Sequence, residues 1–151
     1  MKFHYLLLLS LTLLPAEQVE ISADSFEADE KKMLSILTGN VVLKKGADEV
    51  HANSLTILFD KKNRPKEYLA VGDITFTINT DKQSFDGHAK KLRYDPSTLK
   101  YEISGSAYIH EKTNNSKLYG ETIMIDRISG KSTIKGSKKR PVKFIFQVKE
   151  Q

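Results

Sequence analysis

Cysteine is absent from this sequence of 151 residues. The absence excludes a disulfide framework, a thiol nucleophile and any cysteine-ligated metal site. If the chain works in an oxidising compartment, its stability must therefore come from burial and strand pairing alone.

Long apolar runs are also scarce. The clearest one begins at Tyr5 and ends at Leu14, and its ten residues are half of the roughly 20 that a membrane-spanning helix needs. Lys2 precedes the run and Pro15-Ala16 follows it, an order typical of a secretory signal peptide. We expect a cleavable signal peptide over residues 1–16 and one mature domain over residues 17–151. A retained membrane anchor is the alternative.

Charge restricts the partners only loosely. The formal net charge of +5 suits a phosphorylated or acidic partner, but a charge of this size also simply keeps a small domain soluble. The basic cluster Lys138-Lys139-Arg140 is interpreted as a solvated turn, with contact to acidic sugars or phosphates as the alternative. Basic and acidic residues are interspersed along the chain, so we expect no nucleic-acid partner.

Side chains for catalysis or metal binding are scattered. The four histidines, at positions 4, 51, 88 and 110, have no spacing that would converge on zinc. No nucleophile elbow, phosphate-binding loop or dinucleotide fingerprint occurs. A carbohydrate enzyme would need paired carboxylates in a recognisable arrangement, and none is evident. We predict no catalytic residues, no cofactor and no metal site.

Four similar segments recur along the chain. Each opens with a tiny residue, has an aliphatic residue or Phe three positions later, and ends on an aspartate that we expect to stabilise a turn. A glycine follows each segment, and the first three of these glycines are 33 residues apart. Such a period indicates a repeated supersecondary unit. The tiny residues are Ala23, Ala52, Ala89 and Gly120, the aspartates Asp29, Asp60, Asp95 and Asp126, and the glycines Gly39, Gly72, Gly105 and Gly136.

Within each unit, apolar and polar residues alternate. A period of two with many β-branched and aromatic residues predicts strands with one apolar face, and the short polar turns predict antiparallel hairpins. The parity changes after each tiny residue: Val50 and Ala52 precede Leu55 and Ile57. One extra residue in a bulge would restore the inward direction, so we predict that each long strand bends at its tiny residue.

Three segments resemble the OstA-like domain family. They are residues 37–43 (LTGNVVL), 87–95 (GHAKKLRYD) and 103–108 (ISGSAY), and the opening residues 19–24 (VEISAD) are similar to the family's first strand. Each motif is loose by itself, but their order and spacing together are specific. The resemblance covers nearly all of residues 18–148.

This resemblance implies an all-β antiparallel jellyroll of long bent strands, V-shaped and semi-open, with an apolar groove. It also implies a periplasmic protein that binds lipopolysaccharide through its lipid A acyl chains and forms part of a bridge from the inner to the outer membrane. The expected partners are an LptC-like inner-membrane protein, an LptD-like outer-membrane protein and further copies of the chain, joined head to tail. The chain departs from the family's pattern in its short signal peptide and in its short C-terminal tail, residues 149–151.

The alternating apolar residues are candidates for the groove wall. From the residues alone, a closed core and an open groove are equally acceptable, and the resemblance favours the groove. Phe76 and Tyr94 match positions of the family's inner face. The candidate lipid-binding residues are Val19, Ile21, Val41, Leu43, Leu55, Ile57, Ile74, Phe76, Ile78, Leu92, Tyr94, Ile103 and Ile123.

The C-terminus alternates as strongly as any interior segment. Val142, Phe144, Phe146 and Val148 predict an edge strand that pairs with another chain. The alternative to a lipid carrier is a secreted structural or adhesion-type β-domain with a closed core.

Overall fold

The structure is a computed structural model that describes residues 18–149, and over this range it contains strands and turns but no helix. Residues 18–149 accordingly contain no helix long and apolar enough to cross a membrane. The predicted signal peptide lies outside the described residues. The strands are β1 (Val19–Ser22), β2 (Ser25–Asp29), β3 (Leu34–Lys45), β4 (Asp48–Phe59), β5 (Pro65–Asn79), β6 (Ser84–Asp95), β7 (Lys100–Glu111), β8 (Ser116–Asp126), β9 (Ser132–Lys135) and β10 (Lys143–Ile145).

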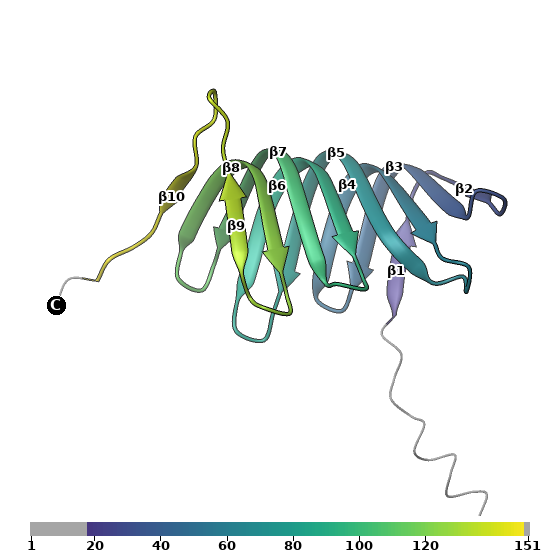
Figure 1. Cartoon of the computed structure of the whole chain (residues 1–151), viewed down its shortest axis with the longest axis horizontal. Coiled ribbons are helices and arrows are strands. Elements are labelled where there is room, and N and C mark those ends of the chain that lie inside the picture. Colours follow the sequence, from purple (N-terminus) through teal and green to yellow (C-terminus); the bar gives the residue numbers. More distant parts are fainter. Residues whose placement is uncertain (1–17, 150–151) are drawn as a thin grey trace, which may run out of the picture.

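All ten strands belong to one antiparallel sheet (Figure 1). The long strands β3 to β8 pair in sequence order, so the sheet is a meander of hairpins. At one end β1 and β2 both pair with β3, and at the other end β9 and β10 both pair with β8. The prediction of an all-β, antiparallel fold is confirmed, and the sheet does not close on itself.

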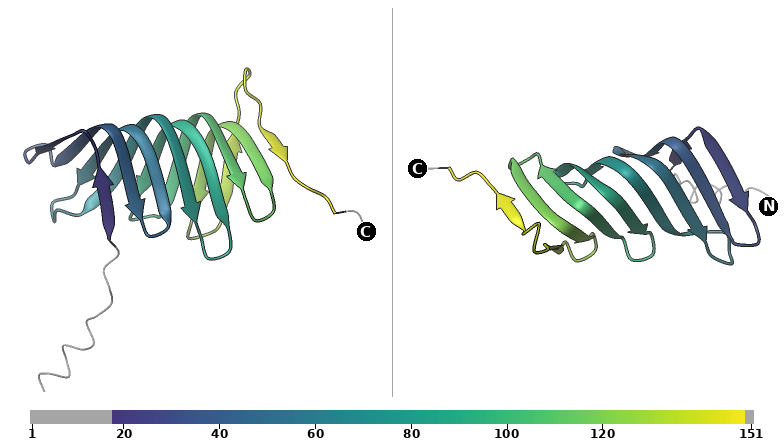
Figure 2. Two further views of the ribbon diagram at one scale, coloured as in Figure 1. Left: turned by 180° about the vertical axis from the view of Figure 1, so that it is seen from behind. Right: turned by 90° about the horizontal axis from the view of Figure 1, so that it is seen from above.

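The long strands bend near their middles, and the bends line up across the sheet (Figures 1 and 2). The pairing register shifts at this bend line in every hairpin, for example between Thr38 and Val41 of β3 and between Ser104 and Ala107 of β7. The bends divide the sheet into two facing arms. Arm 1 consists of β1, β10 and the strand halves between them, and arm 2 consists of β2, β9 and the remaining halves.

The glycines of the 33-residue repeat form the bends of β3, β5 and β7. Gly39, Gly72 and Gly105 have φ values of +83°, +87° and +81°, and the residue after each glycine is also left-handed. Glycine adopts this conformation without the steric cost that a Cβ brings. The neighbouring strand leaves no room for a side chain either, because a Cβ on Gly72 would lie 2.6 Å from the side-chain nitrogen Nδ2 of Asn53.

The bends occur in the predicted part of each strand, but not at the tiny residues. Ala52 and Ala89 are buried on the inner face, and the residues skipped by the pairing are Asn53 and Lys90, one position later. The prediction was wrong by one residue because the change of parity places an extra residue between Ala52 and Leu55 without saying which residue it is. The tiny residues are small because they pack beside the bend.

The aspartates that end the four repeats stabilise turns, as predicted. Each carboxylate accepts a hydrogen bond from a backbone N–H two or three residues later, as Asp29 does from Lys32 at 3.0 Å and Asp95 from Ser97 at 2.9 Å. Hydrogen bonds from the Ser97 hydroxyl and N–H hold the pKa of Asp95 below its ordinary value. Asp60 and Asp126 have lowered pKa values for the same reason. All four turns lie at the free ends of arm 2.

Candidate apolar groove

Two rows of paired residues cross the inner faces of the arms from one end of the sheet to the other. In both rows every member is apolar except one glycine, whose place is filled by the Phe76 ring. The arm 1 row is Ile21, Leu43, Val50, Phe76, Gly87, Ile109, Leu118 and Phe144. The arm 2 row is Phe26, Leu37, Leu55, Ala70, Leu92, Ile103, Ile123 and Ile134.

The predicted wall residues all lie on this inner side. Ten of them belong to the buried core, and Ile74, Ile103 and Ile123 are almost fully shielded at 0–1% exposure. Ile21 and Leu43 are half-buried against the core. Val19 is 37% exposed and lines the cavity described next. Their contact with a lipid stays a prediction.

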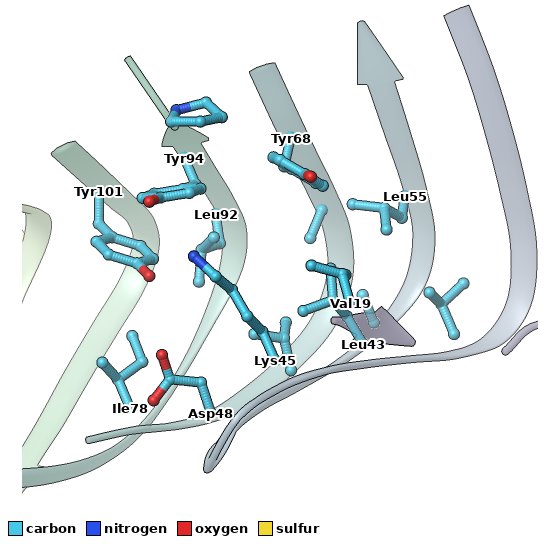
Figure 3. A pocket seen from close by; sticks show the side chains of 15 residues that line it. Val19, Leu43, Lys45, Asp48, Leu55, Tyr68, Ile78, Leu92, Tyr94 and Tyr101 are labelled. Carbon is cyan, nitrogen blue, oxygen red and sulfur yellow. The ribbon is translucent and has the colours of Figure 1, made fainter. Parts of the chain in front are cut away.

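The arms enclose a cavity of about 100 Å³ in the half of the molecule near β1 (Figure 3). Its floor is aliphatic, with Leu55, Ala70 and Leu92 beneath it, and Val19 of β1 forms part of its outer side. Only Lys45 and Asp48 among its lining residues are charged. The cavity therefore suits an apolar guest, but it is smaller than the roughly 150 Å³ that accommodates a benzene molecule in a protein core.

Three tyrosines form the arm 2 wall of this cavity. Tyr68, Tyr94 and Tyr101 are directly paired on neighbouring strands, with ring centroids 6.0 Å and 4.4 Å apart. Burial, with Tyr94 beside it, raises the pKa of Tyr101 to about 12, and burial also raises the pKa of Tyr68. The Tyr68 and Tyr101 hydroxyls are therefore uncharged at neutral pH. The Lys45 ammonium, on the opposite arm, lies 5.6 Å from the Tyr94 ring centroid.

An ion pair connects the two arms at the mouth of the cavity. Arg127, just after β8 in arm 2, places Nη1 3.9 Å from Oδ2 of Asp48, the first residue of β4 in arm 1. Both side chains are partly buried, and Asp48 also accepts a 2.7 Å hydrogen bond from the Asn79 backbone N–H. We call the Asp48–Arg127 pair the strap.

The strap lies where the inner space divides in two. A second, smaller cavity of about 20 Å³ continues toward the β10 end, and Ile78 and Tyr101 border both spaces. Asp48 lines the first cavity and Arg127 the second. A guest that passes along the full length of the inner face must therefore move Tyr101 or part the strap.

Tyr68, Tyr101, Lys45 and Asp48 were not among the predicted wall residues. Tyr101 has the same parity as Ile103, and this shared parity was the available signal. For Lys45 and Asp48 no local signal exists, because they flank a hairpin turn like any pair of surface charges. Their position at the mouth depends on how far the arms close.

The predicted C-terminal edge strand is shorter than expected. Pairing with β8 covers only Lys143–Ile145, so the expectation of a strand through Val148 was wrong. Val142, Phe144, Phe146 and Val148 are 45–74% exposed. Phe144 and Phe146 share the inner side, with ring centroids 5.0 Å apart. Residues 142 and 146–148 have no strand partner, and the four apolar side chains are left in contact with solvent.

Within residues 18–149 no group of three or more His, Asp or Glu side chains is placed to hold a metal ion. The titratable inner-face residue Glu111 is instead turned into its hairpin. Desolvation acts to raise its pKa, but hydrogen bonds from the Asn114 and Thr113 backbone N–H groups, at 2.7 Å and 2.9 Å, outweigh it and lower the pKa.

Two comparisons relate the chain to known lipopolysaccharide transport proteins. Residues 20–131 match the family model described as LptA/(LptD N-terminal domain) LPS transport protein. The fold is similar to the crystal structure of LptH from Pseudomonas aeruginosa, described as the LptA-homologous periplasmic component of the lipopolysaccharide transport device. The TM-score is 0.76 at 18% identity, over 87% of this chain and 96% of that one. No curated protein sequence matches the chain.

Proposed function

Because the chain belongs to the LptA/LptD N-terminal domain family of lipopolysaccharide transport proteins, we propose that it is a non-enzymatic segment of a periplasmic lipopolysaccharide bridge. In this role the inner face shelters the lipid A acyl chains while the sugars stay in water. The proposal includes secretion by cleavage of residues 1–16, which leaves residues 17–151 as the working domain.

The observation that carries the proposal is the pair of apolar rows that reach both ends of the sheet. An acyl chain can be recognised only through burial of its apolar surface, which contributes about 0.8 kcal/mol for each CH₂ removed from water. A row of similar side chains offers nearly the same gain at each step. A lipid would then bind with similar affinity at every position along the groove and would move between positions without a large barrier.

The small cavity volume implies that the arms must move apart to admit cargo. The packed residues at the bend line act as a floor, and the free ends of the arms, near Tyr68 and Lys45, are the part that opens. The open sheet supports this motion, because parting the arms breaks side-chain contacts and the strap but no backbone ladder.

The exposed edges at the two ends suit partners of the same architecture. Arm 1 ends in β1 and β10, and arm 2 ends in β2 and β9. We propose that these edges join an LptC-like protein, an LptD-like protein or another copy, so that the apolar rows continue across each junction. Adding a strand to an unpaired edge satisfies backbone groups that are otherwise left to water.

Photo-cross-linking in cells tests the cargo. A photoreactive side chain replaces Phe76 or Tyr94 on the inner face, and in matched controls it replaces Thr75 or Lys91, which precede inner-face residues and point outward. We expect lipopolysaccharide adducts from positions 76 and 94 only. Adducts from all four positions, or from none, would contradict the proposal.

A closed-core structural or adhesion domain is the alternative, and the near-complete burial of Ile74, Ile103 and Ile123 favours it. Titration of the purified protein with a fluorescent fatty acid separates the two functions. Saturable binding supports the carrier, whereas the absence of binding supports the closed core.

A further inference from the structure

A row of aromatic side chains crosses the outer face of arm 1. His88 of β6, Tyr108 of β7 and Tyr119 of β8 are directly paired on neighbouring strands, and Lys143 of β10 continues the row. Each of the four adjoins an inner-row residue in its own strand, so its side chain points to the outer side of the sheet. We call these residues the outer row. The groove makes no use of them.

The rings of the outer row lean against one another. The ring centroids of His88 and Tyr108 lie 5.0 Å apart, with 31° between the ring planes, and those of Tyr108 and Tyr119 lie 4.8 Å apart, with 41°. The Lys143 ammonium lies 5.9 Å from the Tyr119 ring centroid. The rings therefore cover part of each other's faces. Within residues 18–149 neither tyrosine hydroxyl has a hydrogen-bond partner, so these groups are available to a ligand.

A surface pocket of about 430 Å³ adjoins the outer row. This volume falls in the range of about 300–1,000 Å³ that is usual for small-molecule sites. The pocket is lined by His88 and Tyr119 of the outer row, by residues 106, 107 and 120 beside the bend of β7, and by residues 140, 141 and 143. We call it the outer pocket.

The outer pocket is positively charged. Arg140 and Lys143 line it, and none of its lining residues is acidic. Within residues 18–149 no carboxylate pairs with either cation. The backbone of Arg140 is held in a turn by mutual hydrogen bonds with Ser137 of 2.8 Å and 3.2 Å, and residues 138 and 139 add two more positive charges to this turn.

From these features we propose that the outer pocket binds an anionic saccharide, that is, a sugar that carries a phosphate or a carboxylate. Arg140 and Lys143 pair with the anionic group. The Tyr119 hydroxyl and the His88 imidazole form hydrogen bonds with the sugar hydroxyls, which can both donate and accept. The site lies outside the groove and is independent of the proposed cargo role. It gives the basic cluster at residues 138–140 a function beyond that of a solvated turn.

Two other anionic ligands fit the outer pocket less well. A nucleotide base binds aromatic residues by stacking on a free ring face, and in the outer row each ring already leans on its neighbour. Inorganic phosphate would engage the cations and leave His88 and Tyr119 unused. A charged sugar uses both the cations and the polar ring edges.

Titrations followed by amide NMR of the mature chain test the proposal. Glucosamine 1-phosphate and N-acetylmuramic acid are the charged probes. They distinguish a phosphorylated source, such as the sugars of lipid A, from a carboxylated source, such as cell-wall glycan. The controls are neutral N-acetylglucosamine, inorganic phosphate and adenosine monophosphate.

We expect one or both charged sugars to shift the amide signals of Ser106, Tyr119 and Gly120 saturably and to leave that of Leu55, in the groove, unchanged. The R140Q/K143Q variant should bind at least about tenfold more weakly, because charge-assisted hydrogen bonds are lost. The matched control is K62Q/K66Q, which removes two exposed cations around the turn between β4 and β5 and should bind like wild type.

Tyr119→Phe separates ligand binding from a purely structural role of the outer row. The variant keeps the ring packing and removes only the hydroxyl, so Tm should stay the same while the charged sugar binds about threefold or more weakly. An unchanged affinity in this variant would mean that the row only stabilises the sheet, and would contradict the proposed contact.

The proposal is overturned if neither charged sugar binds, or if N-acetylglucosamine or inorganic phosphate binds equally well. Tighter binding of adenosine monophosphate would overturn it too, as would phosphatidylglycerol vesicles that shift the same signals when the sugars do not. Fatty-acid probe binding by the same variants reports on the groove separately. Failure of the outer pocket therefore leaves the proposed cargo role standing.

Discussion

Asp48 and Arg127 are the charged pair that joins the arms over an otherwise apolar space. An ion pair of this exposure contributes little to stability, about 0–1 kcal/mol. The pair lies between the two cavities, and the arms cannot separate there while it is intact. We therefore expect the pair to contribute little to the stability of the fold and more to keeping the groove closed against the entry of cargo.

We expect Arg127→Gln to admit cargo faster. The variant removes the charge that closes the mouth and leaves the apolar wall unchanged, so a fluorescent fatty acid should bind with a higher association rate and a nearly unchanged Tm. Stopped-flow fluorescence measures the rate. Arg64→Gln is the matched control, because Arg64 pairs with Asp60 at 3.0 Å in an exposed turn away from the cavity. An equal rate in both variants would refute a gating role for the strap.

The charged residues at the mouth are the part of the site that is hardest to predict from the sequence. The alternation of Leu55 and Ile57 with Thr56, or of Ile74 and Phe76 with Thr75, specifies which side chains point inward, and the structure confirms that direction. Nothing local marks Lys45 and Asp48 as different from other hairpin charges. The role of Asp48 depends on a contact with Arg127, about 80 positions away, which arises only once the sheet folds over.

At the scale of the strand, the repeated glycine is the feature that turns a flat meander into a two-armed one. Two successive left-handed residues redirect each odd-numbered long strand, and the next strand follows with a single skipped residue. The sequence repeat indicated the units and their hairpins. It could not place the skipped residue of β4, because a bulge at Ala52 and a bulge at Asn53 produce the same change of parity.

We expect substitutions at a bend glycine to cost more than substitutions at a turn glycine of similar conformation. Gly72→Ala introduces both an unfavourable φ and a clash with Asn53, and should destabilise the protein by at least about 1–3 kcal/mol. Gly130→Ala shares the positive φ, but nothing lies within 4 Å of its Cβ, so it should cost less. Urea unfolding of both variants gives the comparison. Equal losses would mean that packing against Asn53 does not matter.

The short terminal strands show a different limit of sequence interpretation. Residues 142–148 alternate as well as any buried strand, yet only Lys143–Ile145 pair. Alternation predicts which face a strand would present, but it does not say how many residues form backbone hydrogen bonds, and only residues 143–145 pair with β8. The unpaired Phe146 beyond them is consistent with a strand that another chain completes.

At the scale of the whole molecule, the apolar rows end on exposed side chains instead of polar caps. Phe26 is 65% exposed at one end and Phe144 is 55% exposed at the other. A monomer that worked alone would gain from replacing both with polar residues. Their presence agrees with ends that are covered in an assembly.

We expect Phe144→Asp to weaken self-association about tenfold or more, because burying a phenylalanine side chain contributes about 1.5–3 kcal/mol and a buried carboxylate opposes it. Ile128→Asp is the matched control, since Ile128 is 71% exposed and lies in the turn between β8 and β9, outside the strands that form the edges. Light scattering over a concentration series measures the mass. Equal masses for wild type and Phe144→Asp would show that this edge takes no part in assembly.

Strand pairing in the meander is local along the chain. Every strand pairs only with strands one or two places away in the chain, so nothing ties the first hairpin to the last. Removing or inserting one 33-residue hairpin would leave the pairings on either side unchanged and alter the length of the molecule by two strand spacings, about 10 Å. The reach of such a protein across a gap is therefore adjustable in fixed steps, and evolution or design can set it by counting hairpins.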